Sequence, residues 1–450
     1  MVRPMVVMRT VASPLCAVAW SPVAGAVVAG SAGANTVEAV DPSARSWSSG
    51  GPRVVGVPAF ARWLEYVDCG AWLLPPGSWL HRRSTDTLQT ALKLVWTEGT
   101  ARSVGMSLSR PGEAVSTTTL RHNPLNAVTA TVERIADADG RTVIRKELRE
   151  PLDAEGPWAA STDPRHWNYW RRELEVYQDD ELRMDLHEAG LVLPEAEVEE
   201  HPGGAVLYLE DIDGLPGTEF ALEDHAALFR ACGRWQAGPA PDLPWTSEGF
   251  LRTYSTSRDV PWELLDDDAA WRQPLVADNW PAGLRAAWKK LVANRNELLT
   301  AVETLPRARC HLDLWVSNVI RRPTGEIALL DWAFTGDGAR GEDLGNHIPD
   351  AVFDLFWPAE RIEELAETCL ENYLEGLRQA GWRGRPSEVR LAVMASGVKY
   401  AWLLPGLLAR ASENSHQAYH RKADSRHLFQ QRGLALAFVA DWCSQAVDQL

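Results

Sequence analysis

The sequence predicts an α+β protein in which a small antiparallel sheet comes first and a larger, mainly helical region follows. Residues 127–135 and 142–148 alternate in polarity like half-buried strands, and the turn-forming residues 137–140 lie between them. From Leu222 onwards the apolar residues recur mostly at the spacing of helices. Strands that come first and helices that follow are the order expected of the α+β class.

Composition narrows the class of protein and the class of partner. The 450 residues are enough for one large core or two moderate ones, and 45% of them are hydrophobic, as in ordinary soluble globular proteins. The net charge of −16 argues against nucleic acid or an anionic membrane as the partner. Six scattered cysteines form no CxxC pair, which indicates reduced thiols in a cytoplasmic protein rather than disulfides or a zinc site. The sequence does not indicate an oligomeric state.

Residues 1–105 differ from the rest of the chain. They carry nine basic and six acidic residues, whereas the remaining 345 positions carry 36 and 55 and a net charge of −19. The segment has no sustained period of 2 or 3.6, and Pro14 and Pro22 interrupt the opening apolar stretch that superficially resembles a signal peptide. We therefore expect 1–105 to be disordered or a non-native N-terminal extension, with Met106 near the natural start.

Further elements are predicted on both sides of the most informative stretch. Residues 162–180 have the pattern of a helix, because Pro164 suits a first turn and aromatic and apolar residues recur at helical spacing behind it. Glu173 lies beside this apolar stripe, whereas Glu175 points away from it. The other expected strands are 191–194 and 205–209, and the other expected helices are 225–236, 284–305, 359–380, 386–411 and 425–448.

The most informative stretch runs from Cys310 to Asn346 and contains a short hairpin. Val319-Ile320 and residues 327–330 form its strands, and Pro323-Thr324-Gly325 forms its turn. Because apolar residues bury both strands, the polar residues around the hairpin should emerge together at one end; they are His311, Asp313, Asn318 and Asp331. Such a set can hold Mg²⁺ and accept a proton from a hydroxyl, although Asn and Asp are also ordinary turn residues.

The pattern H-x-D-x-x-x-x-N, followed by a hairpin and Asp-Trp, resembles the core of the aminoglycoside phosphotransferase and choline kinase family. These are small-molecule kinases with a protein-kinase-like fold. Glu342-Asp343-Leu344 resembles a later family segment whose Asp braces the catalytic loop. The resemblance implies a bilobal fold, with an N-lobe at 106–212 that holds the nucleotide and a helical C-lobe at 213–450.

The resemblance also implies a reaction, in which the γ-phosphoryl group of ATP, or of GTP, moves to a hydroxyl of a small molecule. Asp313 would be the catalytic base, and His311 would orient the catalytic loop. Asn318 and Asp331 would bind Mg²⁺.

The remaining site residues are also implied by the resemblance. Lys146, in a strand similar to the family's A-x-K strand, would contact the nucleotide phosphates, and Glu173 would orient it. Residues 205–212 resemble the hinge whose backbone binds adenine, which points to Glu210 and Ile212. Asp343 would support the structure of the catalytic loop.

Leu312 leaves an alternative open, because the family usually has glycine there. We expect an ordinary negative φ and a side chain packed inward, since Leu314 and Trp315 continue an apolar environment. A displaced loop would instead favour a pseudokinase-like protein that binds nucleotide without turnover. The acceptor could be an antibiotic, a choline-like amine, a sugar, an amino acid or a peptide or metabolite of natural-product biosynthesis. The acidity of the chain favours a cationic or neutral hydroxyl-rich acceptor over an anionic one.

Overall fold

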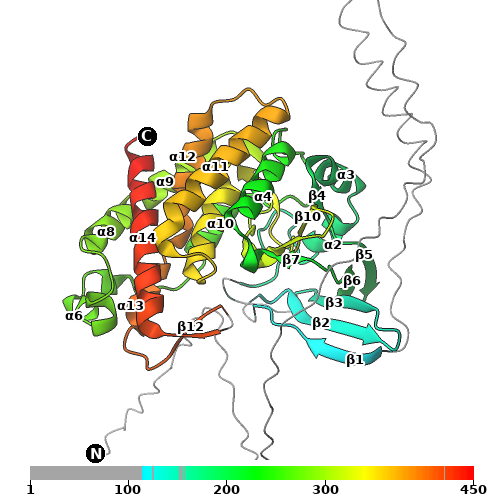
Figure 1. Cartoon of the computed structure of the whole chain (residues 1–450), viewed down its shortest axis with the longest axis horizontal. Helices are drawn as coiled ribbons and strands as arrows, with labels where there is room; N and C mark the ends of the chain where they lie inside the picture. The colour runs from blue at the N-terminus through cyan, green and yellow to red at the C-terminus, as the bar shows by residue number, and fades with distance from the viewer. Residues whose placement is uncertain (1–113, 124–125, 152–155, 157, 420) are drawn as a thin grey trace, which may run out of the picture. The chain divides into compact units, whose positions relative to one another are not determined.

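The computed structural model describes residues 114–450, except residues 124–125, 152–155, 157 and 420 (Figure 1). The predicted extension at 1–105 and the start at Met106 lie outside the described residues. Within the described part, a sheet formed near its start is followed by a mainly helical region, so the α+β prediction is confirmed.

The first sheet has five antiparallel strands in the order β1-β2-β3-β6-β5. The strands predicted at 127–135, 142–148 and 205–209 correspond to β2, β3 and β6. The edge strands β1 and β5 were not predicted, because β1 is exposed along its whole length and β5 is largely acidic. The bounds are β1 Ala114–Thr119, β2 Thr129–Asp137, β3 Thr142–Arg149, β5 Ala196–His201 and β6 Gly204–Glu210.

The helix predicted at 162–180 was wrong in its extent. Residues 162–171 form turns, and only α2 (Arg172–Tyr177) is helical before α3 (Asp180–Ala189) begins after its own cap, Asp179. The aromatic spacing misled the prediction, because Trp167 packs into a separate cluster with Trp158 and Phe250 instead of extending the stripe of α2. The backbone carbonyls of Pro164, His166 and Trp167 in these turns accept hydrogen bonds from the side chain of Arg172.

The predicted hairpin is present, and it belongs to a second, four-stranded sheet in the order β4-β10-β9-β7. Its strands are β9 (Val319–Arg321) and β10 (Ile327–Leu329), and β4 (Leu191–Val192) pairs with β10 in parallel. The edge strand β7 comprises Leu215–Pro216. A separate pair, β8 (Arg307–Cys310) and β11 (Gly336–Ala339), flanks the hairpin in sequence. The loop at residues 311–318, which carries His311, Asp313 and Asn318, is therefore anchored at both of its ends by strands.

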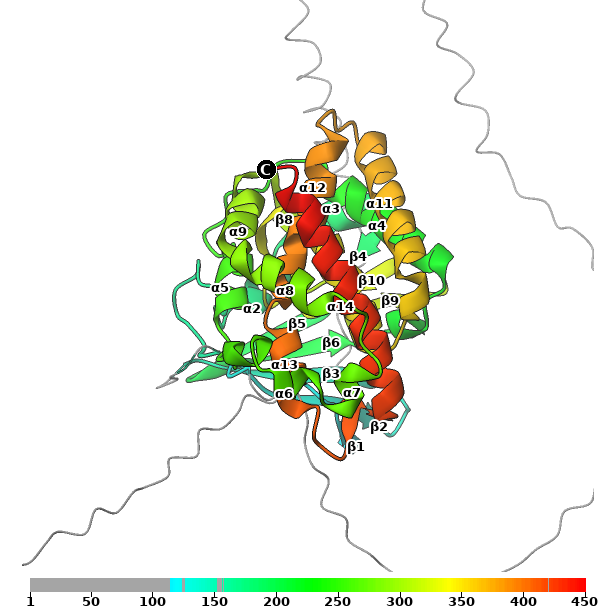
Figure 2. The same ribbon diagram turned by 90° about the vertical axis from the view of Figure 1, so that its left-hand side faces the viewer.

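Helices make up most of the chain after Leu222, and Figure 2 shows α4 and α11 side by side, as well as α8 and α14. Two predicted helices are interrupted: 284–305 divides at Asn294, and 386–411 divides at the 3-10 turn η5 (Gly397–Tyr400). The helix α10 was not predicted. The helical bounds are α4 Leu222–Trp235, α5 Phe250–Thr256, α6 Asp268–Trp271, α7 Pro274–Ala277, α8 Leu284–Ala293, α9 Arg295–Thr304, α10 Glu342–Phe353, α11 Ile362–Gln379, α12 Pro386–Ser396, α13 Leu403–Arg410 and α14 Ser425–Val447.

Short elements complete the described chain. The 3-10 turns are η1 Gly217–Glu219, η2 Trp262–Leu265, η3 Val316–Asn318 and η4 Ala359–Arg361, and a small hairpin pairs β12 His416–Ala418 with β13 Arg421–Ala423. One helical run, Pro386–Arg410, is long and apolar enough to cross a membrane, but 83% of its most apolar window is buried inside the molecule, as in a core helix.

Candidate active site

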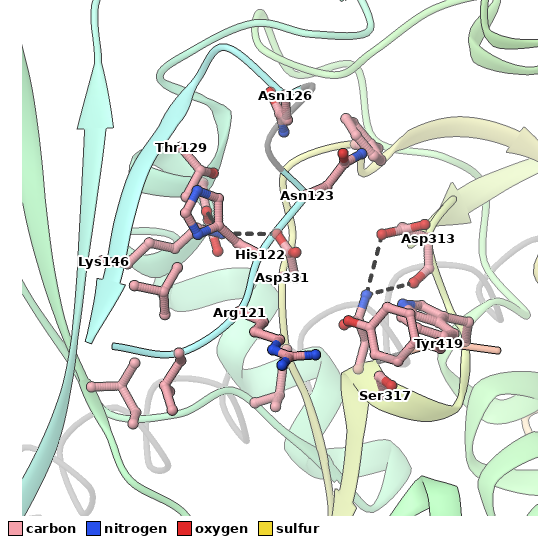
Figure 3. A pocket seen from close by; sticks show the side chains of 18 of the residues that line it. Arg121, His122, Asn123, Asn126, Thr129, Lys146, Asp313, Ser317, Asp331 and Tyr419 are labelled. Carbon is pink, nitrogen blue, oxygen red and sulfur yellow. Dashed lines mark hydrogen bonds and ion pairs between the residues drawn. The ribbon is translucent and has the colours of Figure 1, made fainter. Parts of the chain in front are cut away.

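A cavity of about 510 Å³ is lined by residues from both the five-stranded sheet and the helical region. Figure 3 shows how Lys146, Asp331 and Asp313 lie along it. Most of the predicted site residues line it, namely Lys146, Glu173, Glu210, Ile212, Asp313, Asn318 and Asp331. His311 and Asp343 do not line it, and both side chains are fully buried.

Lys146 is held by two carboxylates that come from distant parts of the sequence. Its Nζ lies 2.7 Å from Glu173 Oε2 and 2.9 Å from Asp331 Oδ1. The strand β3 lies between β2 and β6, which buries the lysine stem and leaves 6% of the residue exposed. Burial by itself would lower the pKa of Lys146, but the two carboxylates more than offset this and raise it. Lys146 is therefore an ammonium group directed at Asp331.

The pKa values of the two carboxyl groups, Glu173 and Asp331, are shifted in opposite directions. Burial raises the pKa of Glu173, which is almost entirely enclosed. Burial also acts on Asp331, but the charge of Lys146 outweighs it and lowers the pKa of that carboxyl. The Asp331 side chain keeps 46% of its surface exposed. Asp331 is thus the ionised group of the pair that is open to a ligand.

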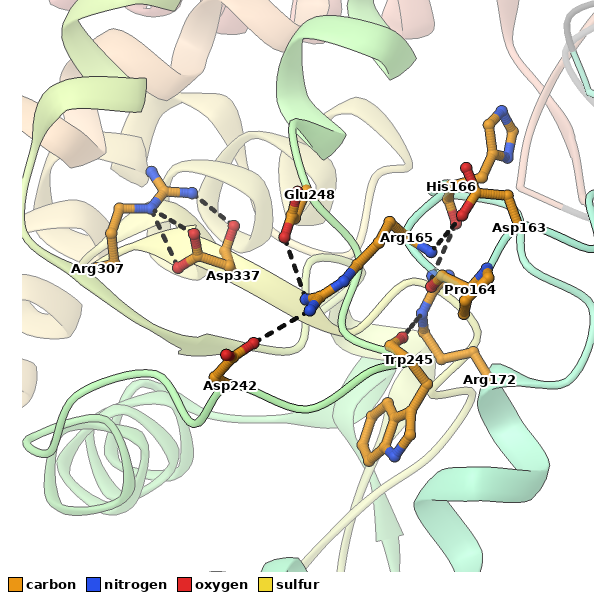
Figure 4. A network of polar contacts seen from close by, with 10 residues as sticks. All are labelled: Asp163, Pro164, Arg165, His166, Arg172, Asp242, Trp245, Glu248, Arg307 and Asp337. Atoms are coloured by element: carbon orange, nitrogen blue, oxygen red, sulfur yellow. Dashed lines mark hydrogen bonds and ion pairs between the residues drawn. The ribbon is translucent and has the colours of Figure 1, made fainter.

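Arg172 fixes the segment that carries Glu173 (Figure 4). Its guanidinium donates hydrogen bonds of 2.7–3.2 Å to the five backbone carbonyls of Pro164, His166, Trp167, Trp245 and Ala333. Burial lowers the pKa of Arg172 to about 9. Because Ala333 follows Asp331 by two residues, one side chain ties the helix of Glu173 to the loop of Asp331. Sequence reasoning did not single out Arg172.

The loop at residues 311–318 is held in place by Asp343 at the start of α10. The backbone N–H groups of His311 and Leu312 donate to its two carboxylate oxygens at 2.9 and 2.8 Å, and Gln236 Nε2 donates at 2.6 Å. His311 Nε2 lies 3.0 Å from the carbonyl oxygen of Leu330 and so connects the loop to the residue before Asp331. Asp343 and His311 thus connect this loop to α10 and to the residue before Asp331.

The backbone of Leu312 differs from the predicted conformation, whereas its side chain is packed as predicted. Its φ is +64°, in the left-handed region, where an ordinary negative φ was expected. The side chain is nevertheless fully buried, as predicted, and lies against Gly338 of β11, where a β-carbon would approach it to 2.9 Å. The loop thus keeps a backbone conformation suited to glycine, and Leu312 fits it because β11 leaves room.

Asp313 and Asn318 are joined to each other at the cavity wall. Asn318 Nδ2 donates to the Asp313 carbonyl oxygen at 2.9 Å and to its Oδ2 at 3.2 Å. Burial raises the pKa of Asp313 to about 7, with Lys399 opposing this rise. A carboxyl with that pKa can accept a proton near neutral pH.

The donor set near Asp331 suits a hard divalent cation. Asn318 uses its nitrogen toward Asp313, which leaves Oδ1 as an amide oxygen, and Asp331 offers an ionised, half-exposed carboxylate. Oxygen donors of these two kinds are the ones that Mg²⁺ prefers. Among the described residues, no group of three or more His, Cys, Asp or Glu could hold a metal alone. A bound Mg²⁺ would therefore need further oxygen ligands, such as phosphates or water.

The two predicted hinge residues differ in how open they are. Ile212 lines the cavity near Leu209 and Ile144. Glu210 also lines it, but its backbone N–H already donates to Glu195 at 2.8 Å and its carboxylate pairs with Arg322 at 2.5 Å. Ile212 is consequently the better placed of the two to meet a ligand with its backbone.

Sequence reasoning missed two groups of residues that line the cavity. Arg121, His122 and Asn123 lie between β1 and β2, and no motif in the sequence marks them (Figure 3). The second group comes from the helical region and has no motif at all: Tyr254, Arg258, Asp350, Asp354, Lys399, Tyr400, Trp402 and Tyr419. Only the general position of this second group, on helices late in the chain, could have been anticipated.

Solved structures of several kinases match this chain at low sequence identity. An amicoumacin kinase in complex with AMP-PNP, Ca²⁺ and Ami is 15% identical and covers 82% of this chain and 96% of its own, with a TM-score of 0.41. An aminoglycoside phosphotransferase from Streptomyces rimosus is 15% identical over 70% of this chain and 98% of its own, with a TM-score of 0.37. A choline/ethanolamine kinase family protein from Mesorhizobium loti is 17% identical over 79% of this chain and 99% of its own, with a TM-score of 0.41. No curated protein sequence matches the chain.

A sequence model of the phosphotransferase enzyme family gives the assignment. It matches residues 130–385, which is more than half of the chain and includes the segments of Lys146, Asp313 and Asp331. The resemblance found around the hairpin and the bilobal, protein-kinase-like fold that it implied are therefore confirmed. The chain belongs to the phosphotransferase enzyme family.

Proposed function

We propose that this protein transfers the γ-phosphoryl group of ATP to a hydroxyl of a small molecule, in the cytoplasm and with Mg²⁺. One observation carries the proposal. Lys146, Asp331 and Asp313 meet along one cavity, although 185 residues separate Lys146 from its partner Asp331. An ammonium, a metal-binding carboxylate and a carboxyl that can act as a base are the groups that phosphoryl transfer from a nucleotide to a hydroxyl requires.

In this proposal one end of the cavity binds the nucleotide and its metal ion. Lys146, oriented by Glu173, neutralises phosphate charge, and the backbone at Ile212 faces the adenine. Asn318 and Asp331 hold Mg²⁺, which supplies charge neutralisation on the phosphate oxygens when it is bound. The ordered Arg172 network keeps Glu173 and Asp331 at a fixed separation, so the groups need little rearrangement when the nucleotide arrives.

Asp313 acts on the acceptor hydroxyl. Its carboxylate accepts the hydroxyl proton as the oxygen attacks the γ-phosphorus, the bond from the γ-phosphorus to the bridging oxygen breaks, and ADP leaves with that electron pair. The hydrogen bond from Asn318 Nδ2 to Asp313 Oδ2 keeps one carboxylate oxygen oriented and leaves Oδ1 for the proton. The same contact joins the base to a proposed metal ligand, so the acceptor and the nucleotide are aligned by one pair of residues.

Substitution of the two aspartates separates these roles. Asp313→Asn should abolish phosphoryl transfer and leave the affinity for Mg-nucleotide within about twofold, because Asp313 contacts the acceptor in this proposal. Asp331→Asn should weaken Mg-nucleotide binding by about tenfold or more, because it removes a charged metal ligand. Calorimetric titration with MgADP gives the affinities, and consumption of ATP or GTP with a panel of hydroxyl acceptors gives the activity.

A matched control is Asp242→Asn, since the Asp242 side chain is 92% exposed and lies outside the cavity lining. This variant should keep both the affinity and the activity. Equal losses of MgADP affinity in the Asp313 and Asp331 variants would contradict the division of roles. A wild-type protein that binds neither MgADP nor MgATP would contradict the proposed function as a whole.

A further inference from the structure

Lys399 is a buried ammonium at the cavity wall that the proposed chemistry does not use. It lies in η5, is 3% exposed and lines the cavity. Within the described part of the chain, its Nζ has neither a hydrogen bond nor a carboxylate oxygen within 4.0 Å. Its immediate neighbours are aromatic, with ring centroids at 5.1 Å for Tyr254, 5.8 Å for Tyr400 and 5.9 Å for Phe250.

Such a group is unusual because burial of a charge without a direct partner is unfavourable. Contacts with aromatic faces recover only part of the lost hydration. The amine nevertheless stays charged: burial would lower the pKa of Lys399, but the more distant carboxylates of Asp350, Asp313 and Glu342, together with Tyr254, raise it. A charged donor that faces a cavity and has no direct acceptor indicates that a ligand supplies one.

The wall next to Lys399 is aromatic and held in place. The Arg258 guanidinium lies 4.0 Å from the ring centroid of Trp402, 5.0 Å from that of Trp158 and 5.1 Å from that of Tyr254. Arg258 also donates to the Tyr254 hydroxyl at 2.7 Å. These contacts restrict the three rings, all of which line the cavity, to one arrangement, and fixed aromatic rings at a cavity wall suit a flat ring in the ligand.

A second aromatic pair lies near Asp313. Trp315 and Tyr419 meet edge to face, with ring centroids 4.6 Å apart, and both line the cavity (Figure 3 labels Tyr419 beside Asp313). The acceptor end of the cavity is thus bounded by rings and carries charges of both signs, from Asp350 and Asp354 and from Lys399 and Arg258. The net acidity of the whole chain therefore does not describe this end of the cavity.

We propose that the acceptor carries a flat unsaturated ring and has an oxygen substituent beside the hydroxyl that is phosphorylated, and that Lys399 donates a hydrogen bond to this oxygen. The inference rests on the proposed phosphoryl transfer, because Asp313 marks where the reacting hydroxyl lies. An ammonium group in place of that oxygen would face the like charge of Lys399 and is selected against. The rings select against acceptors that have only saturated, fully hydroxylated surfaces.

Three related glycosides test both parts of the proposal as probes. Phenyl β-D-glucopyranoside has the ring and the neighbouring oxygens, methyl β-D-glucopyranoside lacks the ring, and phenyl 2-amino-2-deoxy-β-D-glucopyranoside replaces one oxygen by an ammonium. Their affinities for the full chain saturated with MgADP are measured by ligand-observed NMR titration. We expect the phenyl glucoside to bind about tenfold tighter than each of the other two, because each of them lacks one favourable contact. A tenfold ratio of dissociation constants corresponds to about 1.4 kcal/mol.

Two lysine variants then locate the selectivity. Lys399→Met should reduce the preference for the hydroxyl over the ammonium probe to about one and keep the preference for the phenyl over the methyl probe, since the ring contacts remain. Lys289→Met, at an exposed lysine of α8, should change neither ratio. A melting curve of each variant establishes that it is folded, and the wild-type ratios decide the proposal even if Lys399→Met does not fold.

The outcomes separate this inference from the proposed function. Tighter binding of the ammonium probe, equal binding of the phenyl and methyl probes, no binding of any probe, or an unchanged preference in Lys399→Met would each overturn the acceptor proposal. If MgADP binds with its expected dependence on Asp331 while the probes fail, only the acceptor proposal falls. If MgADP does not bind to the wild-type chain, the proposed function itself falls.

Discussion

At the scale of single residues, Leu312 and Asp331 adopt backbone conformations that most side chains avoid. Their φ values are +64° and +58°. Aspartate tolerates the left-handed region better than most residues, whereas a leucine there is strained by about 1–2 kcal/mol. The two N–H groups bound by Asp343 and the complete burial of the leucine side chain hold this conformation. Strain of this kind persists where the surrounding structure holds it in place.

This strain predicts an unusual order of stabilities. Leu312→Ala should destabilise the protein by about 2–5 kcal/mol, because it leaves a cavity and keeps the left-handed strain. Leu312→Gly leaves a similar cavity but relieves the strain, so it should be at least as stable as Leu312→Ala, although glycine normally costs stability. Urea unfolding of both variants measures the difference. A glycine variant clearly less stable than the alanine variant would show that Leu312 is not strained.

The pH dependence of activity follows from Asp313. Burial raises its pKa to about 7, so the carboxyl is protonated below that pH and ionised above it. Only the ionised form can accept the hydroxyl proton. We therefore expect kcat/KM to rise about tenfold per pH unit below about pH 7 and to level off above it. Initial rates between pH 5 and 9 with an acceptor found in the panel check this, and a profile that is flat below pH 7 would contradict the assignment of the base.

At the scale of elements, α4 and α11 are packed through reciprocal glycines. A β-carbon at Gly233 of α4 would clash with the carbonyl oxygen of Tyr373, and one at Gly376 of α11 would clash with that of Arg230. The two helices can approach this closely only because both positions lack side chains. The glycines therefore determine the distance between the two helices. Gln236, which follows directly after α4, donates a hydrogen bond to Asp343, so this helix pair also supports the loop that Asp343 holds.

A pair of glycine variants tests this packing. Gly233→Ala should destabilise the protein by about 1–3 kcal/mol, because the new methyl group forces the helices apart. Gly406→Ala in α13 is the matched control, since a β-carbon there would meet no atom within 4 Å, and it should stabilise by about 0.5–1 kcal/mol through helix propensity. Thermal unfolding of both gives the comparison. A destabilised Gly406 variant together with an unaffected Gly233 variant would refute the packing argument.

At the scale of the whole molecule, we expect that residues 1–105 are dispensable. A segment without a continuous apolar face cannot offset the entropy of ordering its backbone, about 1–2 kcal/mol per residue. A chain that begins at Met106 should therefore be soluble, melt at the same temperature as the full chain and keep the same kcat/KM. Limited proteolysis of the full chain should end close to the same point. Loss of solubility or activity in the shorter chain would show that the first residues fold with the rest.

Features that depend on neighbours in the chain could be predicted from the sequence. His311, Asp313, Asn318 and Asp331 could be grouped because one short hairpin brings them together, and Lys146 could be proposed because strand alternation assigns its face. Helical spacing predicts Glu173, and not Glu175, as the partner of Lys146. The two side chains form an ion pair of 2.7 Å, even though the predicted helix around Glu173 is too long. The predicted orientation of a side chain stays correct despite such errors in helix boundaries, because it depends on only one turn of helix.

Features that depend on residues far apart in the chain could be seen only in the folded structure. The turns before α2 are held by Arg172, which donates hydrogen bonds to five backbone carbonyls. Two of these carbonyls belong to Trp245 and Ala333, which are far away in the sequence, so no local pattern predicts this network. The left-handed Leu312 depends on the room beside Gly338, and the acceptor end of the cavity brings Lys399 of η5 beside the ring of Tyr254 from α5. Long-range contacts of this kind arise from the packing of whole elements, which the order of residues along one element does not encode.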